Sequence, residues 1–98
     1  MATYISLFSW TEQGIRGVKD TVKRAAKFHA AIKKAGGKVK EIYWTMGRYD
    51  GVIVFEAPDD ETATALMIGG GAQGNVRTET LRAFDERAMK KILSKARR

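Results

Sequence analysis

Hydrophobic residues recur along four segments of the chain, where successive side chains fall on alternate faces as in β-strands; some of these segments are apolar on one face and others on both. These segments are 3–10, 38–46, 50–57 and 75–83. The third segment is centred on Val52-Ile53-Val54-Phe55 and is apolar on both faces, as is typical of a central strand. The only proline, Pro58, ends that segment.

Three other segments carry apolar residues at the spacing of three and four that is typical of an amphipathic helix. The first is predicted from Thr11 to about Ala35, and Gly36-Gly37 ends it. Its apolar positions are Ile15, Val18, Val22, Ala25 and Ile32. The second begins after an N-cap at Asp59 and is predicted to end at Gly69-Gly70-Gly71, because consecutive glycines disfavour helix.

The last segment, 85–98, predicts a basic amphipathic helix. Its apolar side carries Ala88, Met89, Ile92, Leu93 and Ala96. Such a helix can bind phosphates or an anionic surface. Because it has no Trp or Phe to insert into a membrane, the pattern favours a helix that covers a neighbour's sheet edge or helix.

The resulting order is β-α-β-β-α-β plus a terminal helix, which predicts an α+β, ferredoxin-like fold. Right-handed crossovers put both internal helices on one face of a four-stranded antiparallel sheet. The other face is left open, and we expect it to carry Phe8, Trp10 or Trp44, depending on the strand register. An exposed apolar face usually marks an interface, so the sheet is expected to pack on another subunit. With 98 residues, the chain is expected to form a single domain over 1–98.

Charge is concentrated on the first and last predicted helices. The chain carries a net charge of +7, and residues 12–36 hold seven basic against two acidic residues. Residues 85–98 hold six basic against two acidic residues. Two solvated helix faces are the favoured interpretation, and a nucleic-acid partner is the alternative that rests on charge alone.

Composition excludes several classes of site. The chain has no cysteine, so disulfides, thiolate nucleophiles and Cys-ligated metals are ruled out. Its single histidine has no second ligand at metal-binding spacing, and no metal or cofactor is predicted. The N-terminus lacks the basic head of a signal peptide, and no apolar run approaches the roughly 20 residues that cross a membrane. A cytoplasmic location without a membrane partner is therefore expected.

Four short motifs make the sequence resemble a known family. They are Thr11-Glu12-Gln13-Gly14-Ile15-Arg16, Gly47-Arg48-Tyr49-Asp50, Glu56-Ala57-Pro58-Asp59 and the stretch from Gly74 to Phe84. Together and in this order, they resemble the motifs of the GYD-domain family, and the resemblance extends from Tyr4 to about Leu93. Phe28-His29 and the basic tail depart from the pattern of that family. The resemblance implies a dimeric α/β-barrel architecture, in which two sheets pack face to face. Such barrels host haem chemistry, cofactor-free oxygenation, isomerisation and effector binding, so the resemblance implies an architecture and no particular activity.

Candidate catalytic groups are few. Gly47 suits a tight turn, whereas Asp50 is open to three interpretations: bonding turn amides, facing a ligand, or pairing across a subunit contact. If the chain is an enzyme, proton transfer falls to Asp50, Tyr49, Glu79 or His29. His29 lies close to an apolar helix stripe, and a packed or interface role is favoured over catalysis for it.

A ligand site is suggested by the polar fourth strand. Thr78, Thr80 and Arg82 share one face. With Tyr4 or Tyr43 from neighbouring strands they could surround an anionic small molecule, with Arg82 supplying the guanidinium fork. The alternative is an edge strand whose charges pair across a contact or block aggregation.

The sequence therefore favours a self-associating protein that binds a small organic molecule between subunits, an anionic one if Arg82 takes part. A cofactor-independent enzyme of the same architecture is the first alternative. A nucleic-acid-binding module and a purely structural assembly subunit follow, and whether the chain is an enzyme stays open.

Overall fold

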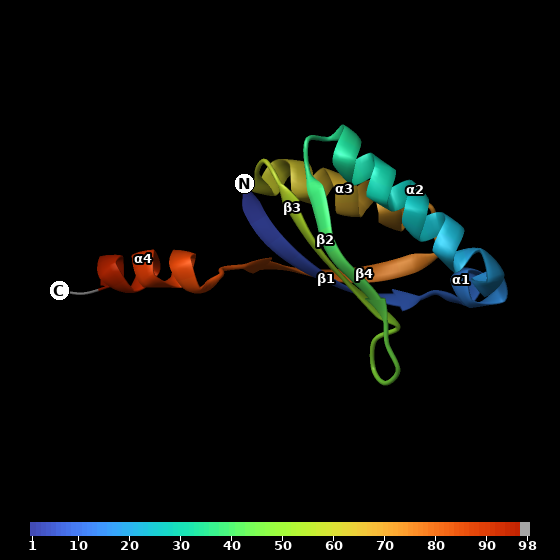
Figure 1. Cartoon of the computed structure of the whole chain (residues 1–98). Helices are drawn as coiled ribbons and strands as arrows, with labels where there is room; N and C mark the ends of the chain where they lie inside the picture. Colours follow the sequence, from blue (N-terminus) through green and yellow to red (C-terminus); the bar gives the residue numbers. More distant parts are fainter. Residues whose placement is uncertain (97–98) are drawn as a thin grey trace.

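The computed structural model describes residues 1–96 and has the predicted ferredoxin-like order with an additional C-terminal helix (Figure 1). Arg97 and Arg98, which the sequence assigned to that helix, lie outside the described residues. The elements are β1 (Ala2–Trp10), α1 (Glu12–Arg16), the short 3₁₀ helix η1 (Val18–Asp20), α2 (Thr21–Lys34), β2 (Lys38–Trp44), β3 (Gly51–Ala57), α3 (Asp60–Ala72), β4 (Val76–Ala83) and α4 (Glu86–Ala96).

The four strands form one antiparallel sheet in the order β2-β3-β1-β4, with α2 and α3 on the same face (Figure 1). The two central strands are those with apolar residues on both faces, since both of their edges are paired. The register places Tyr4 of β1 beside Phe55 of β3 and Arg82 of β4. Residues that alternate with these face away from the helices.

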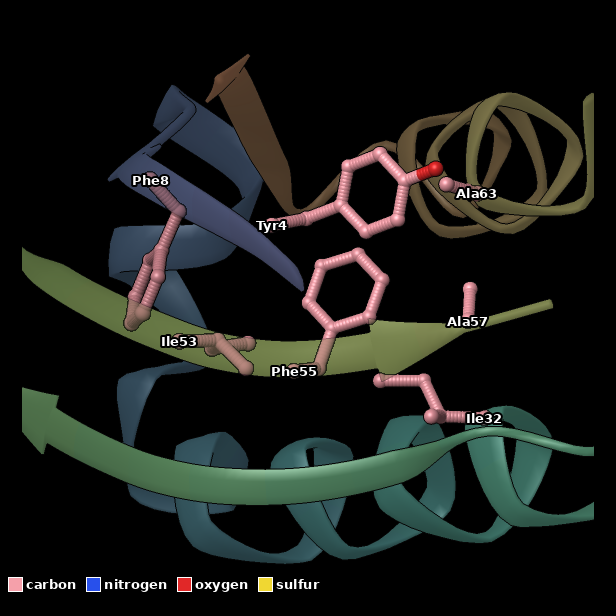
Figure 2. Packing of buried hydrophobic residues seen from close by; sticks show 7 residues of the cluster. All are labelled: Tyr4, Phe8, Ile32, Ile53, Phe55, Ala57 and Ala63. Carbon is pink, nitrogen blue, oxygen red and sulfur yellow. The ribbon is translucent and has the colours of Figure 1, made fainter. Parts of the chain in front are cut away.

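A small core lies between this sheet and the two helices (Figure 2). Its buried members are Tyr4, Phe8, Ile32, Ile53, Phe55, Ala57 and Ala63. The rings of Tyr4 and Phe55 stack with their centroids 5.3 Å apart. Full burial of a ring such as that of Phe55, which is 0 % exposed, contributes about 1.5–3 kcal/mol.

The expected composition of the open sheet face was wrong. Phe8 is buried in the core, and the indole N–H groups of Trp10 and Trp44 both donate to Thr21 Oγ1 at the start of α2. These three aromatic residues therefore face the helices. The open face instead carries a patch of aliphatic side chains, namely Ile5, Leu7, Val52, Val54 and Leu81. We refer to these five residues as the open-face patch.

The single helix predicted from Thr11 to Ala35 is divided into α1, η1 and α2. Gly17 caps α1, and the Arg24 guanidinium donates to the carbonyl oxygens of Gly14 and Gly17, which stabilises the break. Because the chain changes direction there, Ile15 is left 48 % exposed.

The predicted apolar stripe is therefore not continuous along this region. Val22, which belonged to it, is 65 % exposed. Ile32 is fully buried, and Phe28, one turn earlier in α2, packs against the core beside it. The stripe that contacts the core thus begins within α2, after the break.

The glycine run was expected to end the second helix, and it does not. Helix α3 continues through Gly69, Gly70 and Gly71 to Ala72. A side chain at Gly70 would place its Cβ 3.2 Å from the Phe28 ring, so a glycine allows α2 and α3 to approach there. Tertiary packing therefore outweighs the local preference against glycine in a helix.

Helix α4 extends away from the sheet, and none of its described residues is buried (Figure 1). This arm gives the chain a longest dimension of 53 Å, against 30 and 19 Å along the other axes. Among residues 1–96, no helix has both the length and the apolar character needed to span a membrane.

Candidate functional site

A groove of about 680 Å³ lies between α2, α3 and the helix side of the sheet. Its floor comes from the strands and includes Phe8, Ile42 and Ile53, and its walls come from the two helices. The wall residues include Ala25, Phe28 and Ala31 of α2, and Leu66, Met67 and Gly70 of α3. This volume lies within the range of about 300–1,000 Å³ that is usual for small-molecule sites.

Polar groups contribute little of the groove lining, and most of them are already bonded. Ser6, in the floor, donates to the sulfur of Met67 and accepts from Thr80. Thr21 accepts both indole N–H groups, and Arg24 donates to two carbonyl oxygens. The interior is therefore suited to an apolar group, with hydrogen-bonding partners at its rim.

The charged residues that line the groove are both basic. They are Arg24 and Lys27, and no Asp, Glu, His or Tyr is among the described residues that line it. A groove of this composition can bind an apolar molecule with a negatively charged or hydrogen-bonding end. Of the side chains that commonly transfer protons, only lysine is present among the described lining residues, at Lys27.

The predicted ligand residues are divided between three places. Thr78 lines the groove, and Thr80 supports Ser6 beneath it. Arg82 turns toward the start of α3, where its Nη1 lies 3.3 Å from Asp60 Oδ1. Tyr43 lies on the opposite face of the sheet, where its hydroxyl donates to Glu41 at 2.9 Å. The structure therefore does not bring Tyr43 together with the other three.

Tyr4 and Asp60 form a second polar cluster beside Arg82. The Tyr4 hydroxyl donates to Asp60 Oδ1, and the Arg82 guanidinium lies 5.8 Å from the Tyr4 ring centroid. Burial, followed by the hydrogen bond to the Asp60 carboxylate, raises the pKa of Tyr4 to about 12. Tyr4 therefore stays neutral and acts as a donor that joins β1 to the N-terminus of α3.

Two of the four candidate catalytic residues lie together, outside the groove. The Tyr49 hydroxyl donates to Glu79 Oε1 at 3.0 Å. Asp50 has a different contact, since its Oδ2 accepts the backbone N–H of Trp10 at 2.9 Å. His29 is exposed on α2. Among residues 1–96, no three His, Asp or Glu side chains are placed to hold a metal ion.

The Gly47-Arg48-Tyr49-Asp50 motif attaches the β2–β3 hairpin to the sheet. Gly47 has φ = +102°, a conformation that glycine adopts without strain. Tyr49 reaches Glu79 on β4, and Asp50 holds β1 both through its carboxylate and through its own N–H, which donates to Phe8 O at 2.8 Å. The carboxylate of Asp50 thus bonds an amide of a neighbouring strand, whereas its backbone carbonyl oxygen accepts the N–H of Thr45 within the hairpin at 2.9 Å.

Of the ligand residues predicted from sequence only Thr78 lines the groove, and the rest of the lining was not identified as a site. Phe28 lies one helical turn before Ile32, which belonged to the predicted stripe, and could have been assigned to the same inner face of α2. Ser6 interrupts an otherwise aromatic face of β1, and a buried polar residue in such a position is informative. No local sequence signal shows that strand and helix residues far apart in the chain come together around one groove.

Comparison with known proteins gives a consistent family assignment. The model of a family described as GYD domain matches residues 4–93. A Thermus thermophilus protein named glutamine synthetase and cystathionine beta-lyase binding protein is 31 % identical over 85 residues, which cover 86 % of this chain and 90 % of that protein.

Two solved structures share the fold. TTHA0845 from Thermus thermophilus is 28 % identical with a TM-score of 0.55, and the match covers 87 % of this chain and 95 % of that one. MtbAldR (Rv2779c) is 12 % identical with a TM-score of 0.66 over 87 % of this chain. The chain spans about half the length of MtbAldR, at 52 %, and that likeness concerns the fold alone.

Proposed function

The chain belongs to the GYD-domain family, and from that premise we propose that it is a self-associating protein that binds a small organic molecule in the groove between α2 and α3. One observation carries this proposal. The groove is large enough for a ligand, mostly apolar, and has a few polar groups at its rim, which is the usual composition of a binding pocket.

The proposed ligand has an apolar body and an anionic or hydrogen-bonding end. Phe8 and Ile53 of the floor would contact the body, because both side chains belong to the core and border the groove. Arg24 and Lys27 would attract the anionic end, since no carboxylate among the described lining residues opposes them.

This location differs from the one expected from sequence. A ligand between subunits was expected to contact Thr78, Thr80, Arg82 and Tyr43 together. In this proposal Thr78 takes part directly and Thr80 acts by holding Ser6. Arg82 and Tyr43 do not contact the proposed ligand, because Arg82 donates to the Asp60 carboxylate and Tyr43 donates to the Glu41 carboxylate.

Self-association is proposed to occur through the open-face patch. Its five aliphatic side chains lie on a sheet face that no helix covers within residues 1–96; Leu81 is 47 % exposed and the other four are half-buried. Contiguous exposed apolar surface of this kind usually marks an interface.

Binding is favoured over catalysis for the groove. The lining offers no carboxylate, imidazole or phenol among the residues described, whereas the Tyr49–Glu79 pair lies elsewhere. For an enzyme of this architecture, the two candidate residues that contact each other are Tyr49 and Glu79, and Glu79 lies on the open face.

A second candidate function is the binding of another protein. The relative that is 31 % identical is named for binding glutamine synthetase and cystathionine beta-lyase. For this chain we propose binding to enzymes of the same kind as the alternative. It is tested by sedimentation of the chain with each purified enzyme, where co-migration at a fixed ratio would support it and independent migration would contradict it.

The groove proposal is tested with a matched pair of variants on α2. Ala25 lines the groove, whereas Ala26 is exposed and does not. Ala25→Phe would fill the groove, and Ala26→Phe would add the same ring to the outer surface. The probe is 8-anilinonaphthalene-1-sulfonate, which has an apolar body and an anionic group.

Saturable binding of about one probe molecule per chain is expected for the wild type and for Ala26→Phe, with about a tenfold weaker affinity for Ala25→Phe. Equal affinity of the two variants would contradict the groove as the site. Native mass spectrometry of gently purified protein would then report any ligand that the chain retains from the cell.

A further inference from the structure

We infer that α4 is an intermolecular arm whose apolar face packs on a second copy of this chain. The inference goes beyond ligand binding in the groove and rests on the self-association part of the proposed function. Four observations support it: the amphipathic pattern of α4, its isolation from the rest of the described chain, the total exposed surface, and acidic residues at the edges of the open sheet face that form no ion pair within residues 1–96.

The residues of α4 divide into two faces. Met89, Ile92 and Leu93 lie on one side, and Lys90, Lys91 and Ser94 lie on the other, as a period of 3.6 residues requires. Met89 is 44 % exposed and Leu93 is 54 % exposed. Isolated helices shorter than about 12–15 residues are marginal in water, so this helix of 11 residues requires a packing partner.

No part of its own chain provides that partner among the described residues. Figure 1 shows α4 extending beyond the end of β4 and away from the sheet and the other helices. The radius of gyration is 14.8 Å, whereas a compact domain of 98 residues has about 12.6 Å. The chain is therefore more extended than a monomer of its length that folds on itself.

The exposed area supports the same conclusion. The chain exposes 7220 Å², whereas a compact monomer of 10.9 kDa exposes roughly 5,600 Å². The difference of about 1,600 Å² is twice the roughly 800 Å² that each partner buries in a standard interface. The chain thus exposes enough surface for a stable contact with a second copy that includes α4.

The distribution of charged residues indicates which surface of the second copy binds α4. The groove is disfavoured, because Arg24 and Lys27 beside it carry the same sign as the lysines of α4. Glu41 and Glu79 are more suitable, since they lie on the open face at the two edge strands, β2 and β4. Each carboxylate accepts a tyrosine hydroxyl, and within residues 1–96 neither has a Lys or Arg nitrogen within 4 Å.

The arm and the open-face patch also form a continuous surface. Leu81 belongs to the patch, and only Phe84 and Asp85 separate the end of β4 from the start of α4. When a second copy covers the patch, α4 extends along the edge of that copy. The lysines of the arm then lie near the unpaired carboxylates of the partner's edge strands.

Single-cysteine variants test this arrangement, because the chain has no cysteine of its own. Leu93→Cys places a thiol on the apolar face of α4, and Ser94→Cys places a matched thiol on the polar face. The rate of maleimide labelling is measured at protein concentrations above and below the association midpoint. Labelling of Leu93→Cys should slow about tenfold in the associated state relative to Ser94→Cys, and recover on dilution.

Three results would overturn the inference. Protection of Leu93→Cys that does not depend on concentration would mean that α4 folds back on its own chain. Absence of protection in the associated state would mean that the arm stays free. Protection that appears only with phosphatidylserine–phosphatidylcholine vesicles would assign α4 to a membrane surface.

A second pair of variants separates the arm from the sheet contact. By sedimentation, Ile92→Gln should weaken association about tenfold, whereas Ser94→Gln, a neutral change on the polar face, should leave it unchanged. Equal association of these two variants would contradict the arm while leaving the sheet contact standing. A wild type that is monomeric at every concentration would contradict both, and Val54→Lys, in the open-face patch, reports on the sheet contact alone.

Discussion

The glycine run in α3 allows a quantitative test of the fold. Gly69 and Gly71 have open space where a Cβ would lie, with no atom within 4 Å, and neither has a positive φ. Alanine at either position therefore adds helix propensity without a clash. At Gly70, by contrast, the Cβ would lie 3.2 Å from the Phe28 ring.

Replacement of glycine by alanine inside a helix stabilises by about 0.5–1 kcal/mol. Residues two apart on a helix do not face each other, so Gly69→Ala and Gly71→Ala should add to about 1–2 kcal/mol. For a domain of this size each kcal/mol raises Tm by about 4–8 °C. Gly70→Ala should stabilise less than either or destabilise, because the Phe28 ring must shift.

The measurement is urea-induced unfolding followed by circular dichroism at 222 nm, at one fixed protein concentration because the proposed self-association would also contribute to stability. The midpoint should rise for the double variant with an unchanged slope. No gain from Gly69→Ala and Gly71→Ala would mean that α3 ends before Gly69, as the sequence alone predicted. An equal gain at Gly70 would contradict the close approach of α2 and α3.

Two further predictions concern β1. Asp50→Ala leaves the backbone amide of Trp10 without its acceptor and should lower the free energy of unfolding in urea by about 1–3 kcal/mol. Asp50→Asn retains an acceptor oxygen and should cost less. Equal losses in the two variants would show that the hydrogen bond is not the cause. Because the pKa of Tyr4 rises from 10.0 to about 12 on folding, its contribution to stability is fully present below pH 10 and is lost as the pH rises from 10 to 12. Tyr4→Phe should therefore reduce the fall of stability over this range, and an identical pH dependence in both proteins would contradict the burial of that hydroxyl.

The element order could be predicted from sequence because each periodicity is local. Strands β1 to β4 alternate with a period of two, and Pro58 and Asp59 mark the boundary between β3 and α3. The side of the sheet that β1 presents to the helices could not be predicted in the same way. Tyr4 and Phe8 alternate with Ile5 and Leu7, so both faces are apolar, and only the packing against Phe55 and Ile32 decides between them.

The helix boundaries were harder, since single glycines are ambiguous in sequence. Gly17 interrupts the first helical region, whereas Gly69 to Gly71 do not interrupt α3. The difference lies in distant contacts: Arg24 stabilises the break at Gly17, and Phe28 packs where Gly70 has no side chain. Neither contact has a signature within the helix that it affects.

The groove was harder still to predict from sequence, because tertiary structure determines it. Its lining comes from strands and helices that are far apart in sequence. The polar pattern of β4 predicted Thr78 as a ligand residue, and Thr78 does line the groove. The same pattern predicted Arg82, but Arg82 forms an ion pair with Asp60 of α3, which the sequence of the strand does not indicate.

The arrangement around Thr21 gives the protein an optical reporter of its own. Its only two tryptophans, Trp10 and Trp44, donate to the same hydroxyl oxygen, and both Trp44 and Thr21 line the groove. An occupant of the groove that displaces the Thr21 hydroxyl would alter the surroundings of both indoles at once. Intrinsic fluorescence, excited at 295 nm, would therefore record occupancy as a single change in emission maximum and lifetime, without any label.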